Sequence, residues 1–198
     1  MILTPEKALQ ILKDGNERFI NNLKANRNLL QQVNETSQGQ FPFATILSCI
    51  DSRTSAELIF DQGLGDIFSI RIAGNILNED ILGSMEFATK VAGTKIIVVL
   101  GHTKCGAIIG ACNHVELGNL TTLLNKIQPA IYNEKETTDN RTGSNMVFVN
   151  NVTSINVRLT IERIRRESPV IADLEAAGDI KIVGGLYDVE TGKVVFFE

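Results

Sequence analysis

The sequence contains no tryptophan, two histidines, four prolines and three cysteines among its 198 residues. The cysteines are Cys49, Cys105 and Cys112, and an odd, low number of them argues against a disulfide framework and for thiol chemistry or metal binding. No stretch of sequence approaches the roughly 20 apolar residues needed to cross a bilayer. These absences exclude a disulfide-stapled secreted module and a membrane-spanning protein.

An excess of positive charge is also missing, because 19 basic residues face 23 acidic ones and the net charge is −4. A chain of this charge has no electrostatic means of recruiting nucleic acid or an anionic membrane surface. Glu6, Lys7, Lys13 and Asp14 stand where a signal peptide would be apolar, so we expect a cytoplasmic protein. The length and the ordinary apolar content of 43% predict one globular domain over residues 1–198.

Short apolar runs alternate with helical patterns along the chain. The predicted strands are residues 43–48, 67–72, 95–101 and 145–150, followed by a terminal hairpin of 180–188 and 193–198. The predicted helices are residues 5–24, 55–61, 80–91, 117–132 and 151–166, and polar residues 31–40 are interpreted as a loop. This alternation predicts an α/β fold: a mostly parallel sheet of four strands plus a C-terminal antiparallel strand or hairpin, flanked by helices, with a projecting N-terminal helix.

Three residues capable of binding a metal lie where predicted strands end. Cys49 directly follows the run 43–48, His102 directly follows 95–101, and Cys105 comes three residues later. Because ligands of doubly wound sheets bind at the carboxyl ends of the strands, these side chains are expected to meet. Two thiolates and one imidazole suit tetrahedral zinc and leave its fourth position open, as catalytic zinc sites do.

Each of these features also has a plainer interpretation. The pattern His-x-x-Cys is weak by itself, and a lone buried cysteine usually packs as a small hydrophobe, which is how we interpret Cys112. Asp51 and Arg53, just after Cys49, would equally suit a helix cap and a surface ion pair. The joint placement of the three candidate ligands is what favours a metal site.

The segments Cys49-Ile50-Asp51-Ser52-Arg53 and Gly101-His102-Thr103-Lys104-Cys105-Gly106 resemble the two signatures of the β-class carbonic anhydrases, of bacterial type with a plant-like active site. Further similar segments are residues 15–19, 62–68, 71–75 and 84–88, in the family's order. The resemblance implies reversible hydration of carbon dioxide to bicarbonate, with one zinc ion per subunit held by Cys49, His102 and Cys105. It implies that Asp51 and Arg53 form a catalytic dyad, and that Asp51 can leave Arg53 and become a fourth zinc ligand.

The same resemblance assigns four further residues to substrate binding: Gln40, Phe68, Phe87 and Gly106. Gln40 could instead be a solvated loop residue, and both phenylalanines could be plain core. The expected partners are carbon dioxide, bicarbonate and water, together with further copies of the chain in a homodimer or homotetramer. Residues 1–30 would form a helical arm used in dimerisation, although a helix folded back on its own subunit would show the same apolar stripe.

Two other functions fit the same residues. One is hydrolysis of carbon disulfide or carbonyl sulfide on the same scaffold, because the fold does not fix the reaction. The other is a zinc-stabilised binding module without turnover, although a structural zinc site is normally closed by four protein ligands.

Overall fold

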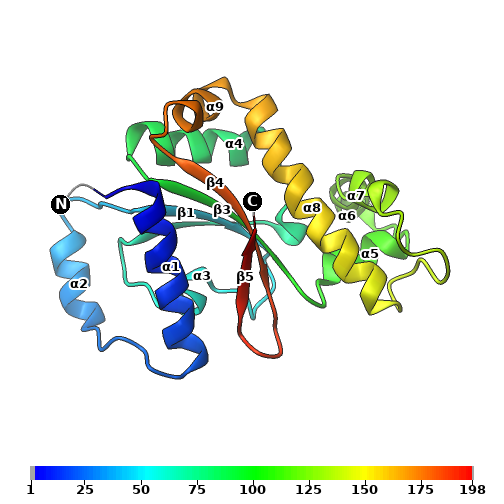
Figure 1. The fold of residues 1–198 in the computed structure, drawn as a ribbon, viewed down its shortest axis with the longest axis horizontal. Coiled ribbons are helices and arrows are strands. Elements are labelled where there is room, and N and C mark those ends of the chain that lie inside the picture. Colours follow the sequence, from blue (N-terminus) through cyan, green and yellow to red (C-terminus); the bar gives the residue numbers. More distant parts are fainter. Residues whose placement is uncertain (1–2, 198) are drawn as a thin grey trace.

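A computed structural model describes residues 3–197 as one α/β unit in which helices cover both faces of a twisted sheet (Figure 1). The sheet has the strand order β2-β1-β3-β4-β5. Its strands are β1 (Ala44–Ser48), β2 (Ile67–Arg71), β3 (Ile96–His102), β4 (Lys181–Tyr187) and β5 (Val194–Phe197). The first four pair in parallel and β5 is antiparallel to β4, which confirms the predicted sheet type.

The helices follow the strands in the order expected of a doubly wound fold. They are α1 (Pro5–Ile20), α2 (Leu29–Thr36), α3 (Ala56–Ile59), α4 (Glu79–Glu86), α5 (Gly106–Cys112), α6 (Gly118–Asn125), α7 (Gln128–Asn133), α8 (Met146–Glu167) and α9 (Pro169–Ala176). A short 3₁₀ turn, η1 (Ala73–Asn75), follows β2, and a π turn, η2 (Phe87–Val91), extends α4. In the part of the chain that the structure describes, no helix is long and apolar enough to cross a bilayer.

Two apolar layers sandwich the sheet because alternate residues of a strand point to opposite faces. Ile46 and Val98 belong to the layer beneath α1 and α3, and Leu47 and Val99 to the layer beneath α4, α8 and α9. A third cluster lies under α5, α6 and α7 and contains Cys49, Cys105 and Cys112. Packing of these layers therefore fixes the strand ends from which the candidate ligands project.

The predicted strand at residues 145–150 is wrong, because these residues begin the long helix α8. The Asn145 side chain accepts hydrogen bonds from the N–H groups of Val147 and Phe148 at 3.1 and 3.3 Å, which caps the helix. Buried residues then recur at helical spacing from Phe148 to Ile164. The prediction failed because a short apolar run does not distinguish a strand from a buried helix. The fourth parallel strand is instead β4, which is the first half of the predicted hairpin.

The other differences are smaller. The predicted loop 31–40 contains helix α2, capped by the Asn28 side chain, which accepts from the Gln31 N–H at 3.1 Å. The helix predicted over 5–24 starts as expected, with Thr4 as its cap, but ends at Ile20. The helix predicted over 117–132 is divided into α6 and α7. The last residue of the predicted segment 193–198 and the first two of the arm 1–30 lie outside the described residues.

Helix α1 lies against its own sheet, with Ala8 and Leu12 fully buried. The segment after it is tied down by Asp61, a buried carboxylate that pairs with Arg18 and Arg27 and accepts from the Ala25 N–H at 3.1 Å. Burial raises the pKa of Asp61, but these hydrogen bonds and charges outweigh burial and hold the pKa below its usual value. Asp61 therefore stabilises the connection between α1 and α2.

Asp61→Asn is expected to lower the free energy of unfolding by about 2 kcal/mol, less than the 3–5 kcal/mol of a fully buried pair, because both guanidiniums stay partly exposed. A lowered folded-state pKa gives stability that is fully present above the unfolded value of about 3.9 and is lost progressively as the pH falls from that value through the folded-state pKa. Urea unfolding at pH 7 and at pH 3.5 checks this. The free energy of unfolding should be higher for the wild type than for the variant at pH 7, and this difference should be smaller at pH 3.5. An equal difference at both pH values would contradict the assignment.

Candidate metal centre

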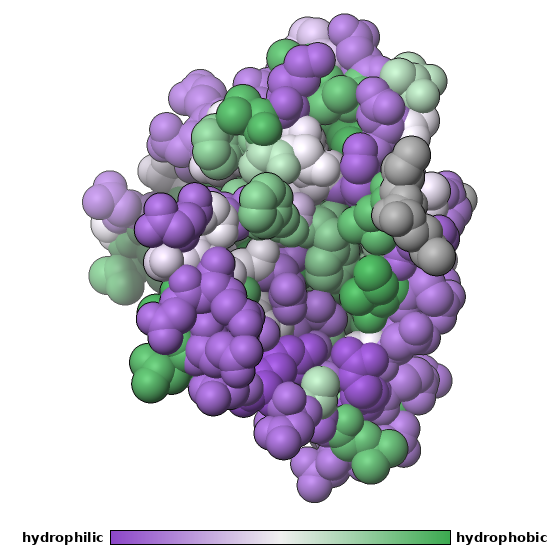
Figure 2. Space-filling view, turned by 90° about the vertical axis from the view of Figure 1, so that its left-hand side faces the viewer, coloured by the Kyte–Doolittle hydropathy of each residue, from purple (hydrophilic) through white to green (hydrophobic). Residues whose placement is uncertain are grey.

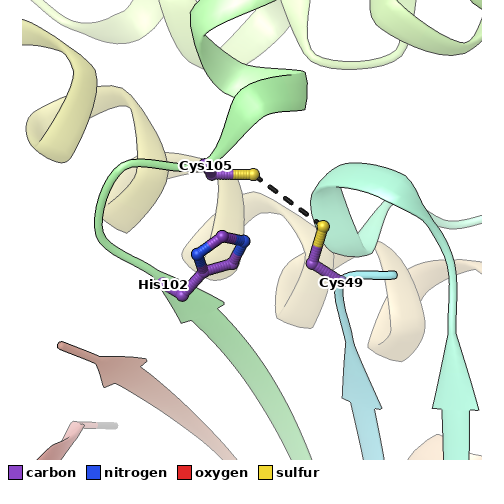
Figure 3. A group of neighbouring side chains, drawn as sticks. All are labelled: Cys49, His102 and Cys105. Carbon is purple, nitrogen blue, oxygen red and sulfur yellow. Dashed lines mark hydrogen bonds between the residues drawn. The ribbon is translucent and has the colours of Figure 1, made fainter. Parts of the chain in front are cut away.

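The structure brings Cys49, His102 and Cys105 together, and we call this group the metal centre. Cys49 follows the last residue of β1, His102 is the last residue of the neighbouring strand β3, and Cys105 caps the N-terminus of α5. Figure 3 shows the two sulfurs and the imidazole facing one another across the strand ends. Parallel pairing of β1 with β3 places these ends side by side, as the sequence predicts.

The geometry of the metal centre fits one tetrahedral ion. The ligand atoms of the three buried residues lie within 4.8 Å of one another. The two Sγ atoms are 3.9 Å apart. Two sulfurs bound to one tetrahedral zinc at about 2.3 Å would lie about 3.8 Å apart, so the thiols need almost no movement.

The imidazole of His102 is set in the tautomer that binds a metal. Its Nδ1 lies 2.9 Å from the Thr103 carbonyl oxygen, which can only accept, so Nδ1 carries the proton. The other nitrogen, Nε2, is buried and has no hydrogen-bond partner among the described residues. A buried lone pair without a partner is costly unless an ion binds it, so this atom is the strongest sign of a metal.

The electrostatics of the two thiols also favour a cation. The pKa of Cys49 is lowered to about 4, chiefly by a hydrogen bond from the Cys105 thiol. Burial opposes this shift, and the Gly74 N–H, 3.3 Å from the sulfur, contributes to it. The pKa of Cys105 is raised because its proton is shared with Cys49 and because it is buried. The pair therefore loses one proton readily, and a divalent cation would supply the positive charge needed to release the second.

Asp51 and Arg53, which we call the dyad, form a two-pronged ion pair beside the metal centre. Arg53 Nε donates to Asp51 Oδ1 at 2.9 Å, Arg53 Nη2 donates to Oδ2 at 2.8 Å, and the Arg53 N–H donates to Oδ1 at 3.0 Å. The bonds from Arg53 hold the pKa of Asp51 far below its usual value. The Asp51 carboxylate is thus turned toward Arg53 in this structure. The metal centre consists of Cys49, His102 and Cys105, without Asp51.

A small apolar pocket of about 310 Å³ opens beside Cys49 and Asp51. Gly106 forms part of its wall, and the remaining wall residues are mostly apolar. They are Ile50, Ala73, Ala107, Gly110, Leu120 and Leu124. The structure therefore places one of the four predicted substrate residues, Gly106, next to the metal centre and the dyad.

The other three predicted substrate residues lie elsewhere on the chain. Phe68 and Phe87 meet edge to face, with ring centroids 6.2 Å apart, and line a groove along the edge strand β2. Gln40 lies in a separate hollow beside α2, formed in part by Val33 and Leu64. Within one chain, none of the three lines the pocket beside Cys49.

Two supporting residues were not predicted from the sequence. Gly74 has a left-handed φ of 67° and directs its N–H to the Cys49 sulfur, a conformation that favours glycine. Thr103 supplies the carbonyl that orients His102, and its hydroxyl lies 3.3 Å from Asp188 Oδ1 in the β4–β5 turn. The only signal in the sequence was their position inside or beside the matching segments 71–75 and 101–106.

Comparison with known proteins agrees with this geometry. A family profile described as "Carbonic anhydrase" matches residues 44–194. Carbonic anhydrase 2 of Mycobacterium tuberculosis is 34% identical over 199 positions, covering 96% of this chain and 92% of the relative. The carbonic anhydrase of Mycolicibacterium smegmatis is 34% identical over 197 positions, with the same coverage.

Solved structures share the fold. The β-carbonic anhydrase CcaA has a TM-score of 0.74 at 24% identity, covering 96% of this chain and 95% of that one. A tetrameric β-carbonic anhydrase from Sordaria macrospora has a TM-score of 0.74 at 24% identity, covering 84% and 89%. With the metal centre at the matching signatures and the profile spanning most of its length, the chain has the fold of the β-class enzymes and belongs to the carbonic anhydrase family.

Proposed function

We propose that this protein catalyses the reversible hydration of carbon dioxide to bicarbonate and a proton, with one zinc ion per chain held by Cys49, His102 and Cys105. The observation that carries the proposal is the buried, partnerless Nε2 of His102, which faces two thiols at tetrahedral spacing. When bound, zinc supplies Lewis acidity that makes hydroxide available near neutral pH.

The dyad would orient the attacking oxygen. Asp51 Oδ2 accepts one bond from Arg53 and keeps a lone pair for the O–H of a reacting water. Arg53 keeps this carboxylate ionised and fixes its direction through charge-assisted bonds. Asp51 would serve as a further zinc ligand only in a state in which its pair with Arg53 is broken.

The pocket beside the dyad suits carbon dioxide, a small apolar molecule. Its walls are mostly aliphatic, and a Cβ added at Gly106 would meet open space, so glycine leaves room there. The relatives reported above are carbonic anhydrases, which favours hydration over hydrolysis of carbon disulfide or carbonyl sulfide. Parallel assays of carbon dioxide hydration and of sulfide release test this choice, and faster sulfide release would overturn it.

The proposal includes a homo-oligomer, either a dimer or a tetramer. Helix α2 has no buried residue, and its Leu29, Leu30 and Val33 are exposed by half or more. Figure 2 shows apolar side chains reaching the surface on this side of the molecule. The outer edge of strand β2 is open in one chain, and the ring of Phe87 is half-exposed although it contacts Phe68. A second subunit packed on these surfaces could bring Gln40, Phe68 and Phe87 to its neighbour's pocket.

Leu30→Glu is expected to reduce the oligomer to a smaller species. Leu30 is 73% exposed in one chain, and a glutamate at this position would bury a charge in the proposed contact between subunits. Light scattering coupled to size-exclusion chromatography measures the mass. Leu117→Glu, at a residue 67% exposed near α6, is the matched control and should keep the wild-type mass. An unchanged mass for Leu30→Glu would remove α2 from the proposed contact.

The cytoplasmic location remains a prediction from the charged first helix.

A further inference from the structure

The segment from Cys49 to Arg53 carries both a ligand of the metal centre and the dyad, and it lies just beyond the sheet. The last backbone bond between β1 and β2 runs from the Ile72 N–H to the Ser48 carbonyl at 3.0 Å. The carbonyls of Cys49 and Asp51 are past this point, so the sheet itself no longer fixes them.

Arg71, the last residue of β2, continues the pairing with its side chain. Its Nε donates to the Cys49 carbonyl at 3.0 Å, and its Nη2 donates to the Asp51 carbonyl at 2.6 Å. The two bonds hold the backbone on either side of Ile50, directly ahead of the Asp51 carboxylate. Arg71 is thus joined to the backbone of the catalytic segment instead of to an acidic side chain.

Thr54 approaches the same two carbonyls from within the segment. Its hydroxyl lies 3.0 Å from the Cys49 oxygen and 2.9 Å from the Asp51 oxygen, and its N–H donates to the Asp51 oxygen at 3.0 Å. One hydroxyl has one proton and can donate to only one of the two at a time, whereas a guanidinium can donate to both at once. A lysine, with a single ammonium group, does not reproduce that fixed fork.

We propose that Arg71 is a positioning residue for the reaction: it fixes the Cys49 and Asp51 carbonyls so that the Asp51 carboxylate meets Arg53 in the two-pronged pair. Arg71 acts through the backbone that carries the dyad: its bonds go to the carbonyls of Cys49 and Asp51 and not to the Cys49 sulfur or the Asp51 carboxylate. The proposal rests on the proposed function. A plainer role would be that of an exposed charge that protects the edge of β2 from unwanted pairing, for which lysine would serve as well.

A double-mutant cycle separates these roles. We expect Arg71→Met and Arg71→Lys each to keep about one zinc per chain while kcat falls about tenfold or more, because a small misplacement of a catalytic group is costly. If Arg71 acts only through the dyad, adding Arg71→Met to Arg53→Ala should change kcat by less than about twofold. Arg165→Met, which removes an exposed arginine paired with Glu175, is the control and should behave as wild type.

Several results would overturn the proposal. They are a near-wild-type rate for Arg71→Lys, loss of zinc in step with activity, and a double variant whose loss equals the product of the single losses. If Arg71→Met does not fold, the double-mutant cycle is measured with Arg71→Lys, which keeps the charge and the aliphatic stem. A zinc-loaded wild type without hydration activity overturns the proposed function and this proposal together, whereas an active wild type with multiplicative losses overturns this proposal alone.

Discussion

His102→Ala, Cys49→Ser and Cys105→Ser are each expected to lose most of the bound zinc and nearly all hydration activity. Each change removes one of three ligands, so zinc affinity should fall by more than the roughly 10–100-fold that loss of a ligand's hydrogen-bond partner costs. Elemental analysis of the purified variants measures zinc per chain, and stopped-flow hydration measures the rate.

Cys112→Ser is the matched control for these variants. Cys112 is a buried cysteine at the opposite end of α5 from Cys105, seven positions further along the helix and so about 10 Å away. Burial raises the pKa of Cys112 to about 11, so it is a protonated packing residue, as the sequence predicted. The control should keep full zinc and activity. Full zinc occupancy in Cys105→Ser would contradict the ligand assignment and point to a substitute ligand.

Arg53→Ala is expected to keep its zinc and lose most of its activity. The Arg53 side chain is 48% exposed, so its removal costs little packing, and it does not belong to the metal centre. Its loss leaves the Asp51 carboxylate without the two bonds that orient it, and each tenfold fall in rate corresponds to about 1.4 kcal/mol of lost barrier stabilisation.

Arg163→Ala provides a control of the same geometry. Arg163 Nε donates to Glu167 Oε1 at 2.9 Å and Arg163 Nη2 donates to Glu167 Oε2 at 3.0 Å, which makes an exposed two-pronged pair on α8. Breaking it should leave the hydration rate unchanged. A zinc-loaded Arg53→Ala protein that turns over as fast as wild type would show that the dyad has only a structural role.

The metal centre was predictable because Cys49 and His102 each directly follow an apolar run and Cys105 comes three residues after His102. Parallel strands end at one edge of a sheet, so Cys49 and His102 were expected at the same edge, and the direct pairing of β1 with β3 brings them side by side. The strand composition was less predictable: residues 145–150 are apolar enough for a strand, and only the cap at Asn145 and the later periodicity identify a helix.

The hydrogen bonds that orient the site were not predictable from pattern. Arg71 reaches carbonyls 20 and 22 residues away, and Thr103 is joined to Asp188 across 85 residues. Such contacts depend on the path of the folded backbone and leave no periodic mark in the sequence. The roles of Gln40, Phe68 and Phe87 need a second chain to be tested, because one chain holds them apart from its own pocket.

The central claim is that a zinc ion at Cys49, His102 and Cys105 makes this protein a catalyst of carbon dioxide hydration. The most direct test is a stopped-flow hydration trace of the wild-type protein, recorded with its zinc content, before and after the metal is removed by a chelator and restored. We predict about one zinc per chain, hydration well above the uncatalysed rate, loss of that rate on removal of zinc, and its return on readdition. A fully zinc-loaded protein that hydrates carbon dioxide no faster than buffer would contradict the account and identify a zinc-stabilised binding module.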